Sequence, residues 1–254
     1  MARNTYGLDL GSYEIKVYDK KQDTIWKEKN VLAVQDKKEI IAIGEDAYQM
    51  YEKTPPDIEV AFPMRDGVIS RFNDMQNLLQ NILKKNRHFS RGAEYVIAVP
   101  TDVTEVQKKA FFDLVIHSNA KAREVNIVER SIADAVGLGI DVQNTTGVMI
   151  INFGGETTEL SVLTEGGIVF NRLLKLGGTT LDQEIVNLVR NSHDFLIGSR
   201  TAEILRQQFD VFNGDSETAF SVAGRDLITG LPMRKTISIT LVCLLYTSDA
   251  ADEA

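Results

Sequence analysis

The sequence predicts an α/β protein built from two related halves, and three observations lead to this fold class. Residues 6–18, YGLDLGSYEIKVY, alternate apolar with small or polar residues around a tight turn, which is typical of a β-hairpin. Residues 147–163, GVMIINFGGETTELSVL, repeat the plan of strand, glycine turn and strand. From residue 95 onward, strand-like runs alternate with helical runs, which indicates helices packed on a mixed sheet.

Short strands are predicted to dominate the beginning of the chain. Strand-like segments cover 15–29 and 31–43, and a short helix covers 44–51. Residues 54–57 contain two prolines, which lack a backbone donor and disfavour helix before them, so we expect extended chain there.

Helices and strands then alternate. Residues 73–86 carry apolar side chains at steps of three and four, which predicts an amphipathic helix. A buried type of strand over 95–99 leads to a helix over 103–118, and a strand over 125–128 leads to a helix that begins at Glu129.

The last part of the chain is predicted to contain two helices and two strands. Gly177 and Gly178 end a strand and start a helix, and Thr201 caps the next helix with Glu203 in its first turn. Strands are predicted over 221–224 and 235–239, with a turn at 230–232 between them.

The two glycine turns are candidate anion sites. Backbone N–H groups at a turn without side chains in the way, as at Gly11 and Ser12, form a concavity that binds phosphate, and the nearby Asp9 could hold Mg²⁺ through water. A single Asp-x-Gly-Ser is more often only a turn. The second turn, at Gly154 and Gly155, favours the phosphate interpretation, because two half-domains can clamp a nucleotide's phosphates between such turns.

Composition narrows the class of protein. The 254 residues carry a net charge of −8 without any run of Lys or Arg, which argues against a nucleic-acid surface. No stretch approaches the roughly 18 apolar residues of a membrane span, and the N-terminus does not resemble a signal peptide, so we expect a cytoplasmic protein. The single Cys243 excludes an internal disulfide.

Several segments together resemble the MreB-type family of bacterial rod-shape-determining, actin-like ATPases. GLDLGS resembles the first phosphate loop of that family, NFGGETTE the second, and VERSIADAVGLG the helix that links the two halves. The segments LGGTTLDQEIV and IGSRTAEILRQQF are similar to the next two helices, and the resemblance runs from about Tyr6 to Thr240. It implies the actin-like ATPase fold, with two ribonuclease-H-like halves, small inserted subdomains and an incomplete second half.

The resemblance also implies domain boundaries. These are 1–30 and 73–138 for the first half, 31–72 for its inserted subdomain, 139–178 for the start of the second half and 179–242 for the second subdomain. Residues 243–254, CLLYTSDAADEA, resemble a translated sequencing adapter, although a genuine divergent tail stays open. We therefore expect the natural protein to continue past Val242, into a last third that carries a Gly-rich loop under the adenine.

The resemblance implies ATP as the cofactor, with Mg²⁺ held at Asp9 in a site that is weak or degraded. The residues that it places around the nucleotide are Asp9, Gly11, Ser12, Tyr13, Glu14, Gly154, Gly155, Glu156, Thr157, Thr158, Gly177, Gly178, Glu203 and Arg206.

Three positions depart from the family pattern. Glu129, Arg130 and Ser131 stand where the family has an acidic pair followed by Pro, so an arginine replaces the carboxylate that positions water. Asn152 replaces an Asp that helps to organise Mg²⁺, and Glu156 replaces a Gly beside the phosphates. We therefore assign no catalytic residue and expect weak binding and impaired hydrolysis, although Arg130 could instead stabilise phosphate charge directly.

The function implied by the resemblance is a membrane-associated filament that maintains rod shape and directs cell-wall synthesis. Its expected partners are further copies of itself, an intact paralogue that supplies ATPase activity, the cell-wall synthesis machinery and the inner face of the cell membrane, but not nucleic acid. A basic loop at residues 84–91 is suited to anionic lipid headgroups, although a solvated helix end explains it as well. Two alternatives stay open: a non-hydrolysing scaffold of the division or pilus type, and a small-molecule kinase, for which no base is found.

Overall fold

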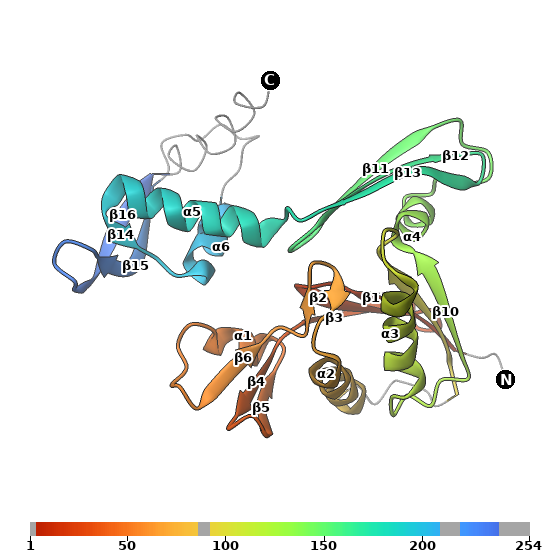
Figure 1. Cartoon of the computed structure of the whole chain (residues 1–254), viewed down its shortest axis with the longest axis horizontal. Coiled ribbons are helices and arrows are strands. Elements are labelled where there is room, and N and C mark those ends of the chain that lie inside the picture. Colours follow the sequence, from red (N-terminus) through yellow and green to blue (C-terminus); the bar gives the residue numbers. More distant parts are fainter. Residues whose placement is uncertain (1–3, 86–91, 209–218, 239–254) are drawn as a thin grey trace. The chain divides into compact units, whose positions relative to one another are not determined.

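The computed structural model describes residues 4–85, 92–208 and 219–238, and it falls into two compact units, residues 1–175 and 176–254 (Figure 1). The basic loop at residues 84–91 and the adapter-like tail lie outside the residues whose side chains the structure describes. No helix in the described ranges is long and apolar enough to cross a membrane. The predicted domain boundaries stay predictions.

The first unit is built on a five-stranded sheet in the order β10-β9-β1-β2-β3. β1, β2 and β3 form an antiparallel meander, and β9 and β10 continue the sheet on the other side of β1 in parallel. The strands are β1 Thr5–Leu10, β2 Glu14–Asp19, β3 Thr24–Lys29, β9 Glu94–Val99 and β10 Glu124–Glu129. The hairpin predicted for residues 6–18 is confirmed.

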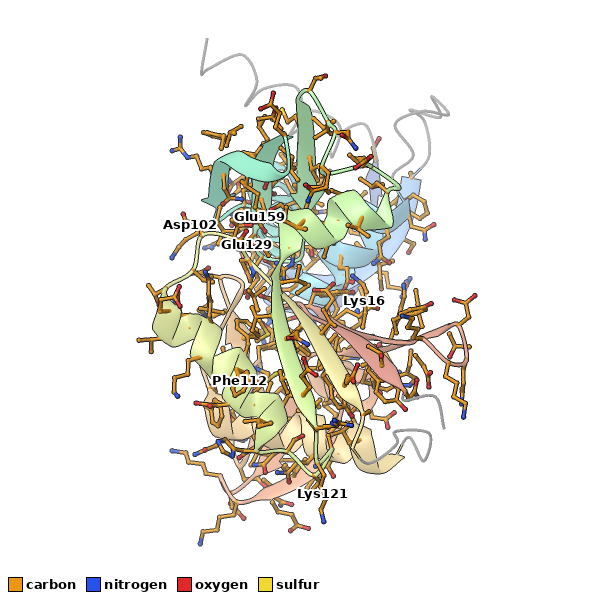
Figure 2. The ribbon with its side chains drawn as sticks, turned by 90° about the vertical axis from the view of Figure 1, so that its right-hand side faces the viewer. Lys16, Asp102, Phe112, Lys121, Glu129 and Glu159 are labelled. Atoms are coloured by element: carbon orange, nitrogen blue, oxygen red, sulfur yellow. The ribbon has the colours of Figure 1, made fainter. Side chains whose placement is uncertain are left out.

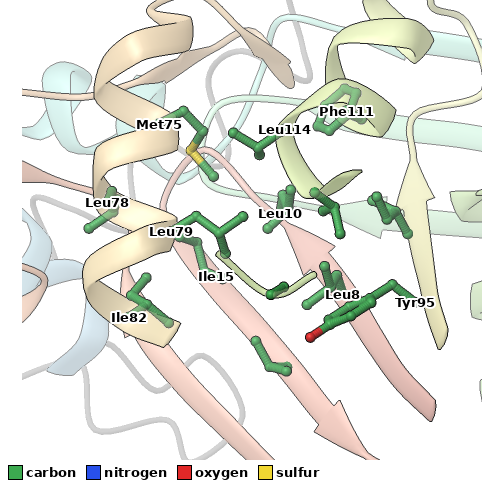
Figure 3. Packing of buried hydrophobic residues seen from close by; sticks show 14 of the residues in the cluster. Leu8, Leu10, Ile15, Met75, Leu78, Leu79, Ile82, Tyr95, Phe111 and Leu114 are labelled. Atoms are coloured by element: carbon green, nitrogen blue, oxygen red, sulfur yellow. The ribbon is translucent and has the colours of Figure 1, made fainter. Parts of the chain in front are cut away.

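One face of this sheet carries the main core. Alternate residues of β1 are buried, as the sequence pattern predicts, and two helices cover them: α2 Phe72–Lys85 and α3 Glu105–Ile116. Met75 and Leu79 of α2 point toward Leu10 and Ile15 of the sheet (Figure 3). α3 begins two residues later than expected, because the Thr104 hydroxyl caps it by accepting from the backbone N–H of Gln107.

A small sheet with its own core precedes α2. It has the order β5-β4-β6, with the strands β4 Leu32–Gln35, β5 Glu39–Ile43 and β6 Ile58–Ala61, and the helix α1 Glu45–Met50 packs on it. A tight hairpin follows, formed by β7 Met64–Arg65 and β8 Val68–Ile69. Asp66 and Gly67 at its tip both have positive φ, 52° and 79°, which suits a two-residue hairpin turn.

The first unit ends in a second meander, β11-β12-β13, which follows the helix α4 Arg130–Gly137. Its strands are β11 Val148–Phe153, β12 Thr158–Thr164 and β13 Gly167–Leu174. The face that includes Ile150 and Leu163 packs with Ala135 of α4. Among the described residues, β11 has no parallel neighbour corresponding to the one that β9 gives β1, so this sheet has three strands where the first has five.

The opposite face of this second meander is apolar and exposed. Met149, Ile151 and Phe153 point to that side of β11 and are each more than half exposed, and Phe170 lies on the same side of β13 by its strand register. We call these four residues the apolar sheet face.

The second unit packs two helices on a small antiparallel sheet. Its elements are α5 Gly178–His193, β14 Phe195–Leu196, α6 Ser199–Gln208, β15 Ala219–Asp226 and β16 Pro232–Ser238. α6 starts at Ser199, so the prediction that Thr201 caps it with Glu203 in the first turn is wrong. The prediction that Pro232 lies in the turn is also wrong, because Pro232 begins the edge strand β16, where a missing N–H is tolerated.

Candidate functional site

The two predicted phosphate turns are closed by the same hydrogen bond. The N–H of Gly11 donates to the carbonyl of Glu14 at 3.1 Å, and the N–H of Gly154 donates to the carbonyl of Thr157 at 2.8 Å. A Cβ on either glycine would lie only 2.8 or 2.9 Å from the accepting oxygen, so neither turn tolerates a side chain there. The repeat seen in the sequence is therefore a repeat in backbone geometry.

The tips of the two turns lie against each other inside the first unit. A Cβ on Gly155 would stand 2.6 Å from the Cβ of Tyr13, so only glycine permits this approach. Asn30 stabilises the first turn, because its side-chain amide donates to the carbonyl of Gly11 at 2.7 Å. The folded chain thus brings together the predicted residues of both turns.

The β7–β8 turn meets both tips. The N–H of Asp66 donates to a carboxylate oxygen of Glu156 at 2.7 Å, and the N–H of Gly67 donates to the Ser12 hydroxyl at 3.2 Å. Lys175 pairs with the Asp66 carboxylate at 2.6 Å. Glu156 is expected from the sequence to place a negative charge on the phosphate side of the second turn. Its carboxylate instead accepts a hydrogen bond from the backbone N–H of Asp66.

A group of charges surrounds Arg130 at the first turn of α4. Its Nη2 lies 3.4 Å from Oδ1 of Asp9, and Nζ of Lys16 lies 3.2 Å from Oδ2 of the same carboxylate. Arg130 is nine-tenths buried. Arg130, at the position where the resemblance implies an acidic residue, therefore forms an ion pair with the predicted metal ligand.

Two further carboxylates lie in this group. Glu159 of β12 accepts from the N–H of Thr101 at 2.8 Å and from Asn171 at 2.9 Å. Figure 2 shows Glu159 and Glu129 at the end of the sheet where β10 runs into α4. Asp134 of α4 accepts from the side-chain amide of Asn152 at 2.7 Å.

Burial raises the pKa of Asp134, and the negative charges of Asp9 and Glu159 add to this. The hydrogen bond from Asn152 and the charge of Arg130 act in the opposite direction without cancelling the shift. The site thus combines one buried arginine with several carboxylates, and the negative charges of these carboxylates repel one another.

The second unit holds the other predicted ligands in a cluster of its own. Arg206 forms a two-pronged ion pair with Asp182, at 2.6 and 3.2 Å, and a Cβ on Gly178 would lie 3.2 Å from Nη2 of Arg206. Glu203 is buried and accepts from Gln207 at 3.0 Å. Burial raises the pKa of Asp182, and Arg206 opposes this shift.

Several site residues escaped sequence reasoning. The dipeptide Asp66-Gly67 carries a recognisable turn signal. Asp134, Glu159 and Asn171 carry none, because a single polar residue within a helix or strand reads as an ordinary exposed position until its tertiary partner is known. In the described part of the chain, no group of three metal-ligating side chains is placed to hold an ion.

Comparison with known proteins assigns this arrangement to a family. The family model described as MreB/Mbl protein matches residues 3–245. The chain belongs to the MreB/Mbl family. Among MreB/Mbl relatives, it is 34% identical over 247 residues to the cell shape-determining protein MreB of Escherichia coli K12, covering 94% of this chain and 71% of that protein. It is 32% identical over 235 residues to the cell shape-determining protein Mbl of Bacillus cereus, covering 91% and 70%.

Solved MreB structures have the same fold. The crystal structure of MreB 5 of Spiroplasma citri bound to AMPPNP aligns with a TM-score of 0.89 at 30% identity, over 99% of this chain and 77% of that one. The MamK double helical filament aligns with a TM-score of 0.75 at 20% identity, over 99% of this chain and 78% of that one, which supports the fold alone. The predicted actin-like fold and the predicted family are confirmed.

Proposed function

We propose that this chain is a filament-forming, cell-shape protein of the MreB/Mbl family that binds the phosphates of ATP at its two glycine turns. The observation that carries the proposal is the direct packing of the turns, with Gly155 against Tyr13 and the same closing bond in each. Such paired turns direct backbone amides toward one anion. Asp9, Gly11, Ser12, Tyr13, Glu14, Gly154, Gly155, Glu156, Thr157 and Thr158 are the proposed phosphate-side residues.

The relatives support a nucleotide ligand, because MreB 5 of Spiroplasma citri has been solved bound to AMPPNP and bound to ADP. Filament formation is our own extension from a shared fold, since the MamK double helical filament is 20% identical to this chain. We extend both properties to this chain, together with a cytoplasmic position at the inner face of the membrane and a role in directing cell-wall synthesis. Gly177, Gly178, Glu203 and Arg206 stay predicted ligands from the second unit.

Hydrolysis is proposed to be impaired. Arg130 stands where the family's water-positioning carboxylate is expected, and its guanidinium is paired with Asp9. A guanidinium does not lose its proton in proteins, so Arg130 cannot act as a general base. Asn152 donates to Asp134 and is uncharged, so it supplies no negative charge to the site.

The test measures ATP binding, phosphate release and ATP-dependent pelleting for the parent and for Arg130→Glu combined with Asn152→Asp. We expect the parent to bind ATP and pellet with it, with phosphate release at background. A positioned acid–base group contributes about 10²–10⁴-fold, so even partly restored geometry should raise release by at least about tenfold in the double variant. Parent turnover at the variant's rate would refute the assignment of Arg130.

The matched control is Arg123→Glu combined with Asn126→Asp. It makes the same change of charge at two exposed positions, just before and within β10. We expect this control to behave as the parent, and thermal unfolding should confirm that both double variants are folded.

The ion pair between Arg130 and Asp9 also favours a second candidate, a non-hydrolysing scaffold of the same fold. ATP-dependent pelleting separates the two functions. A scaffold would assemble or bind partners whether or not nucleotide is present, whereas a filament of the MreB/Mbl type would need ATP to pellet.

A further inference from the structure

Asp9, the predicted Mg²⁺ ligand, already faces two cations. Oδ1 lies 3.4 Å from Nη2 of Arg130, and Oδ2 lies 3.2 Å from Nζ of Lys16. Mg²⁺ is bound through one or two carboxylates in a near-ideal octahedron of oxygens. A divalent ion at Asp9 would have to displace one of these side chains and would be repelled by the other.

The remaining carboxylates near Arg130 are also engaged elsewhere. Asp134 accepts from Asn152, and Oε1 of Glu159 accepts from Thr101 and Asn171. Asn152 turns its amide N–H, not an oxygen, toward this group. The described residues therefore do not fit Mg²⁺, although they form a strongly charged site.

Arg130 retains hydrogen-bonding capacity. A guanidinium has five N–H donors, and within the described part of the chain Arg130 donates one side-chain hydrogen bond, to Asp9. Its Nε is buried and has no hydrogen-bond partner among the described residues. Oε2 of Glu159 is likewise buried and without a partner there. A buried donor without an acceptor is unfavourable, and a phosphate oxygen would relieve it.

We propose that Arg130 is the resident cation of the phosphate site and takes the place of Mg²⁺, so that the chain binds a nucleoside triphosphate without a divalent metal. This inference rests on the proposed function, namely that the glycine turns bind ATP. Arginine is suited to the role, because its planar fork matches two phosphate oxygens and its charge does not depend on pH. Lys16 keeps Asp9 neutralised when Arg130 turns toward the phosphates.

The experiment titrates the full chain with ATP by calorimetry in Mg²⁺ and in EDTA. We expect the two Kd values to agree within about threefold, a difference well below the tenfold that corresponds to a single strong contact. Binding only in Mg²⁺ would overturn the inference and leave the proposed function standing. Absence of binding in both conditions would overturn both.

Two variants distinguish a cation role from a structural one. Arg130→Gln should weaken binding in EDTA by at least about tenfold, the loss of one charge-assisted contact. Mg²⁺ should restore part of the binding, because Asp9 then faces one cation, Lys16, instead of two. Arg130→Lys should keep metal-free binding within a few-fold, since the charge remains. Arg123→Gln, an exposed arginine just before β10, is the control that should change neither Kd.

If Arg130→Gln does not fold, the parent measurement and Arg130→Lys still decide the inference. Equal weakening of Arg130→Gln in both conditions, without any gain from Mg²⁺, would show that Arg130 supports the structure and does not replace the metal.

Discussion

At the scale of single residues, Asp134 gives the site a pH dependence. Burial raises the pKa of its carboxyl, so the native protein binds this proton more tightly than the unfolded chain does. The resulting stabilisation is fully present below the ordinary carboxyl pKa near 3.9 and is lost as pH rises through the raised native pKa. Ionised Asp134 therefore destabilises the first unit at neutral pH.

Asp134→Asn removes this ionisation and keeps an oxygen to accept from Asn152. We expect the melting temperature of Asp134→Asn minus that of the parent to be larger at pH 7.5 than at pH 4.0. These two pH values lie on either side of the sequence pI of about 5.0. Thermal unfolding at the two pH values checks this prediction.

Asp141→Asn is the control with the opposite sign. Hydrogen bonds from Asn144 and Gln143 hold the pKa of Asp141 below its usual value, so its ionised form stabilises the native state and the variant should lose relative stability as pH rises. Parallel trends for the two variants would contradict the assignment.

Gly155 is the residue on which contact between the turns depends. In Gly155→Ala the new methyl group would meet Tyr13 at 2.6 Å, so the tips must separate. We expect a loss of about 1–3 kcal/mol in unfolding free energy, typical of overpacking, together with weaker ATP binding.

Gly167→Ala is the matched control for this substitution. A Cβ at Gly167 would meet nothing within 4 Å, so unfolding free energy and ATP affinity should both stay near the parent values. Urea unfolding and calorimetric titration of the two variants provide the comparison. Unchanged ATP binding in a folded Gly155→Ala would argue against phosphate binding between the tips.

At the scale of helices and strands, the ion pair between Arg206 and Asp182 joins α6 to α5. The geometry is two-pronged, yet burial still raises the pKa of Asp182, which means that desolvation outweighs the attraction for the ionised carboxyl. Such a pair contributes little net stability, but removal of either partner leaves a buried charge uncompensated.

Arg206→Met should therefore cost the second unit about 3 kcal/mol, because it leaves a desolvated carboxylate without its cation. Combining it with Asp182→Leu should bring stability back to within about 1 kcal/mol of the parent, since an apolar pair of similar size replaces the ionic one. Circular dichroism during urea unfolding measures both. A double variant as unstable as the sum of the two single variants would disprove the coupling.

Elements were predictable wherever the pattern was local. The alternation in β1 and the three-and-four spacing in α2 determined type and extent, because each reports one buried face. The start of α6 could not be predicted in this way, because Thr201 followed by Glu203 imitates a capping pattern although the helix begins at Ser199. The candidate site was only half predictable: glycine turns are local signals, whereas pairing of Arg130 with Asp9 spans 121 residues.

At the scale of the whole molecule, the apolar sheet face is the exposed feature with the clearest consequence. Met149, Ile151 and Phe153 are 57%, 59% and 54% exposed and lie in one row, whereas isolated exposed apolar residues are ordinary. We expect this face to promote association of the chain at high concentration without nucleotide.

Ile151→Gln combined with Phe153→Gln should shift nucleotide-free association to higher protein concentration, as measured by sedimentation velocity. Val106→Gln is the control, because Val106 is 78% exposed on α3 and stands apart from this face. Equal association of parent and double variant would exclude the face as the cause. ATP-dependent pelleting should persist in the double variant if pelleting reflects filaments.

The contacts that hold the turn tips also bear on the order in which the first unit folds. Each hairpin closes locally, but Asp66 meets Glu156 across 90 residues and Asp9 meets Arg130 across 121. Loop-closure entropy makes such distant pairs slow to form, so we expect the site to assemble after the hairpins. A ligand that binds only the finished site would then leave the folding rate unchanged and act entirely by slowing unfolding.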